Sequence, residues 1–268
     1  MSTHTLAVLV PVYNEAPHLA PLVQSIAPVL DDVCGNDNWH FVFVNNGSTD
    51  DSASVLAAIA ATLPRTIVLT LPAPNYGIAL KNGFEHAQAD YIYIINVDFW
   101  DKAFLHWGWL NRSQYDLMLG SKRADPTINH LSPYRQFLSW GLNTLLQLFF
   151  GFVGRDTHGQ KMLKTSTLLP HAQKCVMQRG QFDTELVLRA LRAGLWIAEA
   201  PVPIVEIRKQ RNWMICKIYN NVIDIFKLRA EMAKVPWSHS VRYHRWARED
   251  VELGRRVSWH HSEPQRAP

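Results

Sequence analysis

Four apolar segments in the first hundred residues are continuous runs rather than alternating patterns, and this feature most constrains the fold. They are Leu6–Val10, Phe41–Val44, Ile67–Leu71 and Tyr91–Ile95. A strand that is apolar on both faces has to be covered on both sides, as in parallel sheets. Segments with helical spacing of apolar residues separate the runs, at 15–30, 51–63 and 78–87. The pattern predicts an α/β fold, with a Rossmann-like, mostly parallel sheet and helices on both faces.

The second half of the chain adds helices to this sheet. Short strands are predicted at 117–120 and 196–206, and helices at 132–152, 182–193 and 213–232. Beyond residue 236 the chain is rich in Trp, His and Arg and poor in aliphatic residues. We therefore predict one domain over 1–236, with halves at 1–100 and 101–236, C-terminal helical additions, and a polar tail over 237–268.

Composition excludes several classes of protein. With 47% hydrophobic and 19% charged residues, the chain has the apolar content of a globular protein. Its cysteines, Cys34, Cys175 and Cys216, form no C-x-x-C pair, so neither a disulfide framework nor a zinc site is expected, and a reducing, cytoplasmic compartment fits. No apolar run is long enough to span a membrane. The net charge of +4 permits binding to phosphates or anionic lipid, but it does not call for nucleic acid.

Three polar clusters follow predicted strands, at the point where each strand ends. They are Tyr13–Glu15, Asn45–Asn46 and Asn96–Asp98. In open α/β sheets ligands bind at the carboxyl ends of the strands. The sequence therefore predicts that these clusters converge on one binding crevice.

Seven motifs lie in register along residues 5 to 230. They are V-P-V-Y-N-E at 10–15, V-N-N-G-S-T-D at 44–50, N-Y-G-I-A-L-K-N-G-F at 75–84, A-D-Y-I-Y-I-I-N-V-D at 89–98, G-S-K-R at 120–123, R-D-T-H-G-Q-K at 155–161 and F-D-T-E-L at 182–186. Together they resemble the GT-A-fold glycosyltransferases of family 2. Within that family they are most similar to the dolichyl- or polyprenyl-phosphate sugar synthases.

The resemblance implies an inverting glycosyltransferase that moves one sugar from a nucleotide-diphosphate sugar to a polyprenyl phosphate. It further implies a peripheral enzyme at the cytoplasmic face of a membrane. Two other readings stay open. One is transfer to a soluble or glycan hydroxyl group, and the other is a non-catalytic protein that binds a nucleotide sugar, because Asn45, Asn46 and Asn96 replace acids that are frequent in the family.

Asp98 is the candidate catalytic residue and metal ligand on the sugar-nucleotide side. A leaving nucleotide diphosphate needs charge stabilisation, which Mg²⁺ or Mn²⁺ held by a hard oxygen ligand supplies. Asp98 occupies the last position of the family's D-x-D motif, whose first position here is Asn96. A site without metal, or a degenerate enzyme, is the alternative. The predicted sugar-nucleotide ligands are Pro11, Tyr13, Glu15, Asn45, Asn46, Asn96 and Asp98.

Asp183 and Glu185 are the candidate carboxylates on the acceptor side. They are two residues apart at the start of a helix, so they point in different directions and only one is expected to reach the site. A hydroxyl acceptor would need a carboxylate base, whereas a phosphate acceptor is already anionic. Phosphate recognition calls for cations, and the R-D-T-H-G-Q-K motif resembles the family's acceptor-side loop, in which an acid and a later cation recur. The predicted acceptor residues are Arg123, Arg135, Asp156, Lys161 and Arg208.

Two predicted helices present an apolar surface suited to contact with lipid. Residues 138–152 are apolar nearly all round, and residues 213–232 carry Lys217, Lys227 and Arg229 beside an apolar stripe. Such helices bind at a membrane surface or form part of the core. Either reading fits the sequence.

Overall fold

The computed structural model describes residues 4–125, 133–203, 214–238 and 240–253, without the side chains of 133–139 and 214–222. The described chain contains one eight-stranded sheet. Its strands are β1 (Leu6–Val12), β2 (Trp39–Asn46), β3 (Thr66–Leu71), β4 (Tyr91–Ile94), β5 (Leu117–Ser121), β6 (Lys161–Lys164), β7 (Trp196–Pro201) and β8 (Arg242–Arg245). Its helices are α1 (Ala16–Cys34), α2 (Ser52–Thr62), α3 (Tyr76–His86), α4 (Lys102–Asn111), α5 (Pro133–Phe150), α6 (Thr165–Lys174), α7 (Gln181–Arg192), α8 (Met214–Ala233) and α9 (Arg248–Leu253).

The strand order is β3-β2-β1-β4-β6-β5-β7-β8. β6 pairs antiparallel with β4 and β5, and every other neighbouring pair in the sheet is parallel. β1 lies between β2 and β4, so Val12 pairs with Asn45 and Leu9 with Ile94. The carboxyl ends of these three strands therefore share one edge of the sheet.

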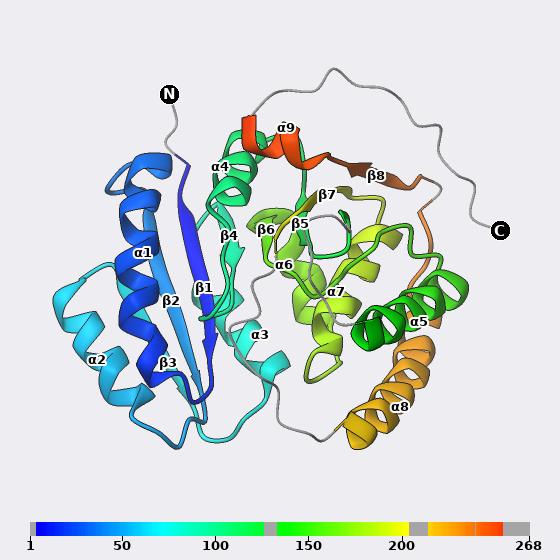
Figure 1. Cartoon of the computed structure of the whole chain (residues 1–268), viewed down its shortest axis with the longest axis horizontal. Coiled ribbons are helices and arrows are strands. Elements are labelled where there is room, and N and C mark those ends of the chain that lie inside the picture. The colour runs from blue at the N-terminus through cyan, green and yellow to red at the C-terminus, as the bar shows by residue number, and fades with distance from the viewer. Residues whose placement is uncertain (1–3, 126–132, 204–213, 239, 254–268) are drawn as a thin grey trace.

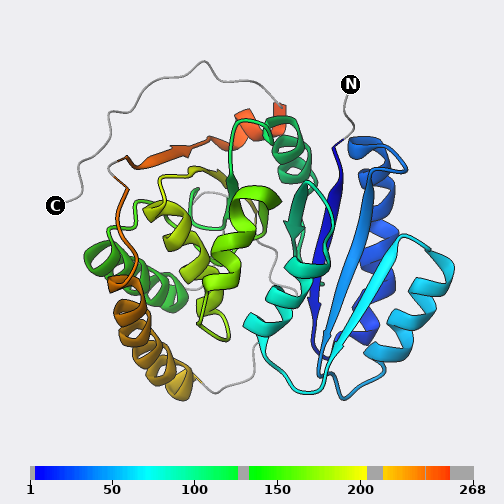
Figure 2. The same ribbon diagram turned by 180° about the vertical axis from the view of Figure 1, so that it is seen from behind.

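Side chains that alternate along β1 enter two separate cores. Leu6, Val8 and Val10 face one side, with helices α1, α2, α4 and α9. Ala7 and Leu9 face the other side, with helices α3, α5, α6, α7 and α8. Figures 1 and 2 show this arrangement from opposite sides, with α1 and α2 at one end of the molecule and α5 and α8 at the other. The predicted fold class, a mostly parallel sheet covered on both faces, is confirmed.

Several elements differ from the sequence-based expectation. The R-D-T-H-G-Q-K motif ends in strand β6, and helices α4 and α6 were not predicted. β6 is only four residues long and follows a loop rich in polar residues, so it carries little strand signal. β7 ends at Pro201, and the rest of the strand predicted to residue 206 lies partly outside the described residues.

The expected polar tail is also different, because residues 242–253 belong to the folded body. β8 pairs with β7, and Trp246 and Val251 are buried in the core with exposed fractions of 6% and 1%. The single Trp and Val are widely spaced among charged residues, so the segment lacks the periodicity that predicts a buried element. The last residues, 254–268, lie outside the described chain.

Candidate active site

The loop after β1 is tied to the loop after β2. Asn14 has a left-handed backbone, with φ 56°, and its Oδ1 accepts a hydrogen bond from the backbone N–H of Thr49 at 2.8 Å. The Asn14 N–H donates to Ser48 Oγ at 3.1 Å, and the Glu15 N–H donates to Ser52 Oγ at 2.9 Å. These bonds place Glu15 at the N-cap of α1 and leave the Tyr13 side chain 47% exposed at the carboxyl edge.

The strand itself supplies the adjoining residue, Pro11. It pairs with Val44 of β2 and is half-buried. Proline cannot donate a ladder hydrogen bond, and here it comes next to last in the strand. Pro11 therefore lies near the carboxyl end of β1, two residues before Tyr13.

Asn45 and Asn46 are buried at the end of β2, with exposed fractions of 2% and 6%. Asn45 Oδ1 accepts from the backbone N–H of Ser48 at 3.2 Å, and Asn46 Oδ1 accepts from the backbone N–H of Asn75 at 2.7 Å. Asn75 in turn caps α3 through the N–H of Ile78 at 3.1 Å. An amide oxygen accepts these bonds as a carboxylate would, without the cost of a buried charge. This is a physical reason why amides suit these two buried positions.

The Asn96–Asp98 turn follows β4 at the same edge. Asn96 and Asp98 are exposed, whereas Val97 between them is 7% exposed and packs into the core. The backbone N–H of Phe99 donates to the Asn96 carbonyl at 3.2 Å and closes the turn. The turn thus presents one carboxylate and one amide to solvent while a buried valine anchors it.

The Asp98 carboxylate and the Asn96 amide fit a magnesium or manganese ion that takes most of its ligands from phosphates and water. In the described chain no three His, Cys, Asp or Glu side chains gather to form a complete protein cage. A single exposed carboxylate with a neighbouring amide oxygen is the donor set that a nucleotide-bound ion uses. The residues present are therefore compatible with such an ion.

Asp156 organises the loop that precedes β6. Its Oδ2 accepts from the backbone N–H of Lys122 at 3.2 Å, and its Oδ1 accepts from the N–H of His158 at 2.9 Å. Arg123 is half-buried beside this loop. Burial lowers the pKa of the Arg123 guanidinium, while the charges of Asp156 and Glu199 act in the opposite direction. Arg123 is thus a partly desolvated cation next to Asp156, after the carboxyl end of β5.

Lys161 and Asp183 form a buried ion pair. Their Nζ and Oδ1 atoms are 2.9 Å apart, with side-chain exposures of 1% and 4%. Lys161 Nζ also donates to the Gly159 carbonyl at 2.8 Å, and the Tyr76 hydroxyl donates to Asp183 Oδ2 at 3.0 Å. Burial and the Asp183 charge hold the pKa of Tyr76 well above its ordinary value. In this structure Lys161 is a partner of Asp183 and is not placed for contact with a ligand phosphate.

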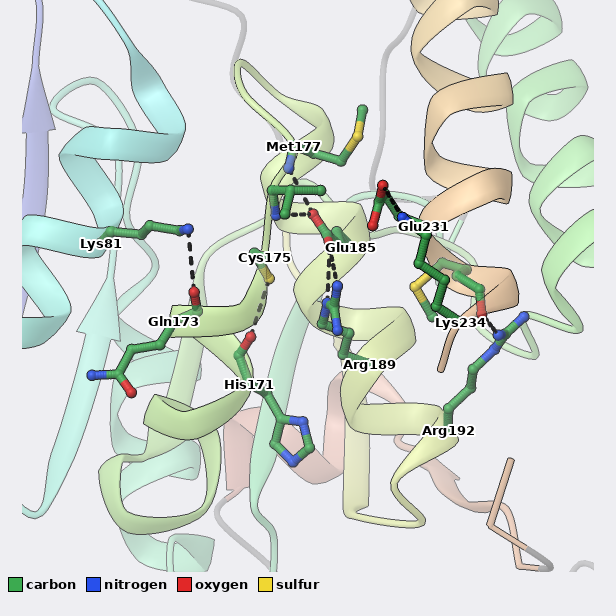
Figure 3. Close-up of polar contacts among 12 residues, drawn as sticks. Lys81, His171, Gln173, Cys175, Met177, Glu185, Arg189, Arg192, Glu231 and Lys234 are labelled. Carbon is green, nitrogen blue, oxygen red and sulfur yellow. Dashed lines mark hydrogen bonds and ion pairs between the residues drawn. The ribbon is translucent and has the colours of Figure 1, made fainter. Parts of the chain in front are cut away.

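Glu185 is fully buried, and its contacts hold the loop that precedes α7 (Figure 3). Its Oε2 accepts from the backbone N–H groups of Val176 at 2.8 Å and Met177 at 2.7 Å. Its Oε1 accepts from Arg189 Nε at 2.8 Å and lies 2.7 Å from Arg189 Nη2. One of the two carboxylates was expected to face the site, but Asp183 and Glu185 are both enclosed and paired inside the protein.

Helices α5 and α8 each bury one side and expose the other. Leu146, Phe150 and Leu228 lie in the core, with exposed fractions of at most 3%. Among the described side chains of the two helices, the exposed large apolar residues are Trp140 at 60%, Leu148 at 74%, Phe149 at 37% and Phe226 at 62%. The Arg229 guanidinium lies 5.1 Å from the centre of the Phe149 ring, which joins the two exposed surfaces. Among the described residues, every helix is too short or too polar to span a bilayer.

Two predicted phosphate ligands cannot be placed. Arg208 lies outside the described residues, and so does the side chain of Arg135, although its backbone belongs to α5. The sequence analysis missed Asp101, which caps α4 by accepting from the Phe104 N–H at 2.8 Å. An acid three residues before Phe104, directly after the Asn-x-Asp turn, is a helix-start signal that could have identified it.

Residues 7–105 match the family model for glycosyl transferase family 2. This chain carries a glycosyltransferase family 2 domain. The match covers β1, β2, β3 and β4 with the edge formed by their carboxyl ends, and it reaches into α4. The resemblance drawn from the seven motifs is confirmed.

Curated relatives extend the similarity of this glycosyltransferase beyond the domain. A dolichyl-phosphate beta-glucosyltransferase of Trichomonas vaginalis is 27% identical over 250 residues, or 88% of this chain and 74% of the relative. A second protein with this description from the same organism is 26% identical, covering 82% of this chain and 71% of the relative. An undecaprenyl-phosphate 4-deoxy-4-formamido-L-arabinose transferase of Enterobacter sp. is 34% identical over 35% of this chain and 29% of its own length.

Solved structures share the GT-A fold. Glucosyl-3-phosphoglycerate synthase from Mycobacterium tuberculosis, in complex with Mn²⁺, UDP-glucose and phosphoglyceric acid, has a TM-score of 0.61 at 19% identity, covering 88% of this chain and 82% of the other. A mannosyltransferase from Pyrobaculum calidifontis, in complex with GDP-mannose and Mn²⁺, has a TM-score of 0.62 at 21% identity, covering 88% and 67%. The chain is a glycosyltransferase with a GT-A fold.

Proposed function

We propose that this glycosyltransferase moves one sugar from a nucleotide-diphosphate sugar to a polyprenyl phosphate, with inversion at the sugar. The observation that carries the proposal is the similarity to dolichyl-phosphate beta-glucosyltransferases over 88% of the chain. The enclosure of Asp183 and Glu185 supports it, because a phosphate acceptor is the acceptor class that needs no carboxylate base.

The sugar nucleotide binds at the edge formed by β1, β2 and β4. Tyr13 offers an exposed ring to the base, and the half-buried Pro11 and Glu15 are the other proposed ligands from this end of β1. Asn45 and Asn46 shape the pocket by fixing the loops at Ser48 and Asn75. These residues set the position of the base and ribose, and the diphosphate then lies toward the Asn96–Asp98 turn.

Asp98 would hold a divalent ion through its carboxylate, with Asn96 as the neighbouring oxygen ligand. When bound, Mg²⁺ or Mn²⁺ neutralises charge on the departing nucleotide diphosphate. Two solved structures of the same fold contain Mn²⁺ with a nucleotide sugar, which supports a divalent ion here. Asp98 supplies an exposed carboxylate in the turn after β4.

The acceptor phosphate is placed beside Arg123 and the Asp156 loop. A phosphate oxygen attacks the anomeric carbon of the sugar, a new carbon–oxygen bond forms, and the bond to the nucleotide diphosphate breaks. The guanidinium of Arg123 holds the attacking phosphate through charged hydrogen bonds. Asp156 keeps the loop in place through the backbone of Lys122 and His158.

The exposed surface of α5 and α8 is proposed to rest on the membrane that contains the acceptor. Leu148, Phe149 and Phe226 supply the apolar contact, and Lys227 and Arg229 lie beside them as exposed cations. An apolar surface with flanking cations suits the interface of an anionic membrane. The proposed localisation is therefore a peripheral one, at the cytoplasmic face.

The sugar donor is identified by thermal stabilisation with nucleotide sugars, each in the presence and absence of Mn²⁺. A ligand that binds the folded state raises its stability in proportion to RT ln(1 + [L]/Kd). We expect a nucleotide sugar to stabilise the protein with Mn²⁺ and to do so much less without it. Failure of all nucleoside-diphosphate sugars to shift the transition would overturn the proposal.

Replacement of Arg123 by Ala is expected to lower kcat/KM for polyprenyl phosphate by about 10- to 100-fold, because a charged hydrogen bond contributes about 1.5–3 kcal/mol. Hydrolysis of the sugar donor should fall far less, since water replaces the acceptor in that reaction. Arg242→Ala is the matched control, because Arg242 is an exposed cation beside Trp196 at the opposite end of the strands. Equal losses in transfer and hydrolysis would exclude an acceptor role for Arg123.

Replacement of Asn96 by Asp is expected to tighten the binding of Mn²⁺ in the presence of the sugar nucleotide. The change adds a second oxygen anion to the exposed turn, and charge attracts a hard cation more strongly than an amide dipole does. The midpoint of a Mn²⁺ titration, followed by thermal stabilisation, should fall about three- to tenfold. An unchanged midpoint would show that Asn96 faces away from the ion.

A further inference from the structure

Asp101 is the point at which the metal-site turn is joined to the rest of the protein. It follows Asp98 by three residues, and its carboxylate caps α4 through the Phe104 N–H at 2.8 Å. Its own backbone N–H donates to Gln160 Oε1 at 3.2 Å, and the Tyr93 hydroxyl also donates to that oxygen. The Asn96–Asp98 turn is therefore held at one end by β4 and at the other by Asp101.

Arg248 of α9 binds the same carboxylate from the other end of the chain. Its Nη1 lies 3.0 Å from Asp101 Oδ1, and its Nη2 lies 3.2 Å from Oδ2. Nη1 also donates to the Pro201 carbonyl at the end of β7, at 3.1 Å. Side-chain exposures of 15% for Arg248 and 11% for Asp101 leave the pair little contact with water. A two-pronged, largely buried contact of this kind fixes orientation as well as distance.

The segment that carries Arg248 is itself firmly attached. β8 pairs with β7, and the Trp246 N–H donates to the Glu199 carbonyl at 2.9 Å. The Trp246 ring lies 5.4 Å from the ring of Trp107 on α4, edge to face. Val251 of α9 is 1% exposed. Residues 242–253 are therefore firmly packed against the sheet and α4, and this packing fixes the position of Arg248 next to Asp101.

We propose that Arg248 and Asp101 are positioning residues that hold the Asn96–Asp98 turn in the geometry needed for a nucleotide-bound divalent ion. The inference rests on the proposed function for the ion, but it adds a role for residues 242–253, which lie outside the family 2 match. Without the Arg248 contact, the turn still follows β4 and Asp101 still caps α4. Asp101 then loses its link, through Arg248, to the end of β7. The turn should then sample more conformations.

Hydrogen–deuterium exchange of the full-length, metal-free protein tests this directly. In Arg248→Met, amides of residues 95–101 are expected to exchange about tenfold faster than in the wild type, while amides of β1 and β2 keep their rates. The midpoint of a Mn²⁺ titration with the stabilising nucleotide sugar should rise about tenfold, as is typical when a residue behind a metal ligand is lost. Arg248→Lys should recover part of both effects, because it keeps the charge without the two-pronged geometry.

Glu252→Gln is the matched control. Glu252 pairs with Arg248 Nε at 2.8 Å and is 56% exposed, so its loss removes an ion pair on α9 without touching Asp101. We expect unchanged exchange at 95–101 and an unchanged Mn²⁺ midpoint. A second variant, Asp101→Asn, keeps a capping oxygen for α4 and should behave like Arg248→Met.

Two results would overturn the inference. One is exchange at 95–101 that does not change in Arg248→Met, and the other is faster exchange spread evenly over the molecule, which indicates a loss of global stability alone. Both are measured without substrate, so they leave the proposed function standing. An Mn²⁺ midpoint that is unaffected by Asp98→Ala would instead refute the metal role of Asp98 in the proposed function.

Discussion

Replacement of Asp98 by Ala is expected to lower the rate of sugar transfer at least about 1,000-fold, which corresponds to about 4 kcal/mol of transition-state stabilisation. Asp98 supplies the exposed carboxylate at the turn after β4, so its loss removes the protein's anionic ligand for the ion that stabilises the leaving diphosphate. The fold should be unaffected, because exposed substitutions usually change stability by less than about 0.5 kcal/mol. Initial rates of sugar transfer measure the first effect, and thermal unfolding without metal measures the stability of the variant.

Asp37→Ala is the control for this variant. Asp37 is also an exposed carboxylate, but it precedes β2 and so lies at the amino end of the strands, away from the site. Its replacement should leave transfer and the Mn²⁺ midpoint unchanged. Transfer by Asp98→Ala at near the wild-type rate, with the same metal dependence, would refute the assignment of Asp98.

Replacement of Lys161 by Met is expected to destabilise the protein by about 3–5 kcal/mol, the cost of leaving one charge of a buried pair without its partner. The orphaned group is Asp183, which is 3% exposed and, among the described residues, keeps only the bond from the Tyr76 hydroxyl. The pair joins β6 to α7, so the loss should weaken the packing of α7 against β6, while the Tyr76 hydroxyl still links α3 to Asp183. Urea unfolding measures the change in the free energy of unfolding.

Two further variants test whether the expected cost of Lys161→Met comes from the burial of the Lys161–Asp183 pair. Lys161→Met combined with Asp183→Asn should recover much of the lost stability, because the amide carries no charge and its oxygen still accepts from the Tyr76 hydroxyl. Lys234→Ala removes an exposed pair with Glu231, in which the Lys234 side chain is 68% exposed, and should cost less than about 1 kcal/mol. A cost below about 1 kcal/mol for Lys161→Met would mean that the pair is solvated.

The sequence was sufficient to predict the fold because its signals are local. Continuous apolar runs such as Leu6–Val10 report burial on both faces, and β1 does contribute to both cores. β6 and β8 carry no such signal. β6 is four residues of mixed polarity, and β8 reads Arg-Tyr-His-Arg, so both depend on pairing with strands already in place.

The sequence predicted the location of those site residues that directly follow a strand. Tyr13 and the Asn96–Asp98 turn lie at the expected edge because strand ends determine where loops emerge. The burial of Lys161 and Asp183 depends on three segments far apart in the sequence, which meet only in the folded protein. The Arg248–Asp101 contact likewise joins residues 147 positions apart in the sequence, so neither spacing nor motif could reveal it.

The most direct test of the acceptor class compares three substrates with the sugar donor identified by thermal stabilisation. They are detergent-solubilised polyprenyl phosphate, the matching polyprenol without phosphate, and simple sugars. The enclosure of Asp183 and Glu185 and the placement of Arg123 favour an acceptor that is already anionic. We expect product with polyprenyl phosphate and at least about 100-fold slower transfer to polyprenol, which lacks both the anionic nucleophile and the contact with Arg123. Transfer to polyprenol or simple sugars in the absence of any product with polyprenyl phosphate would contradict it.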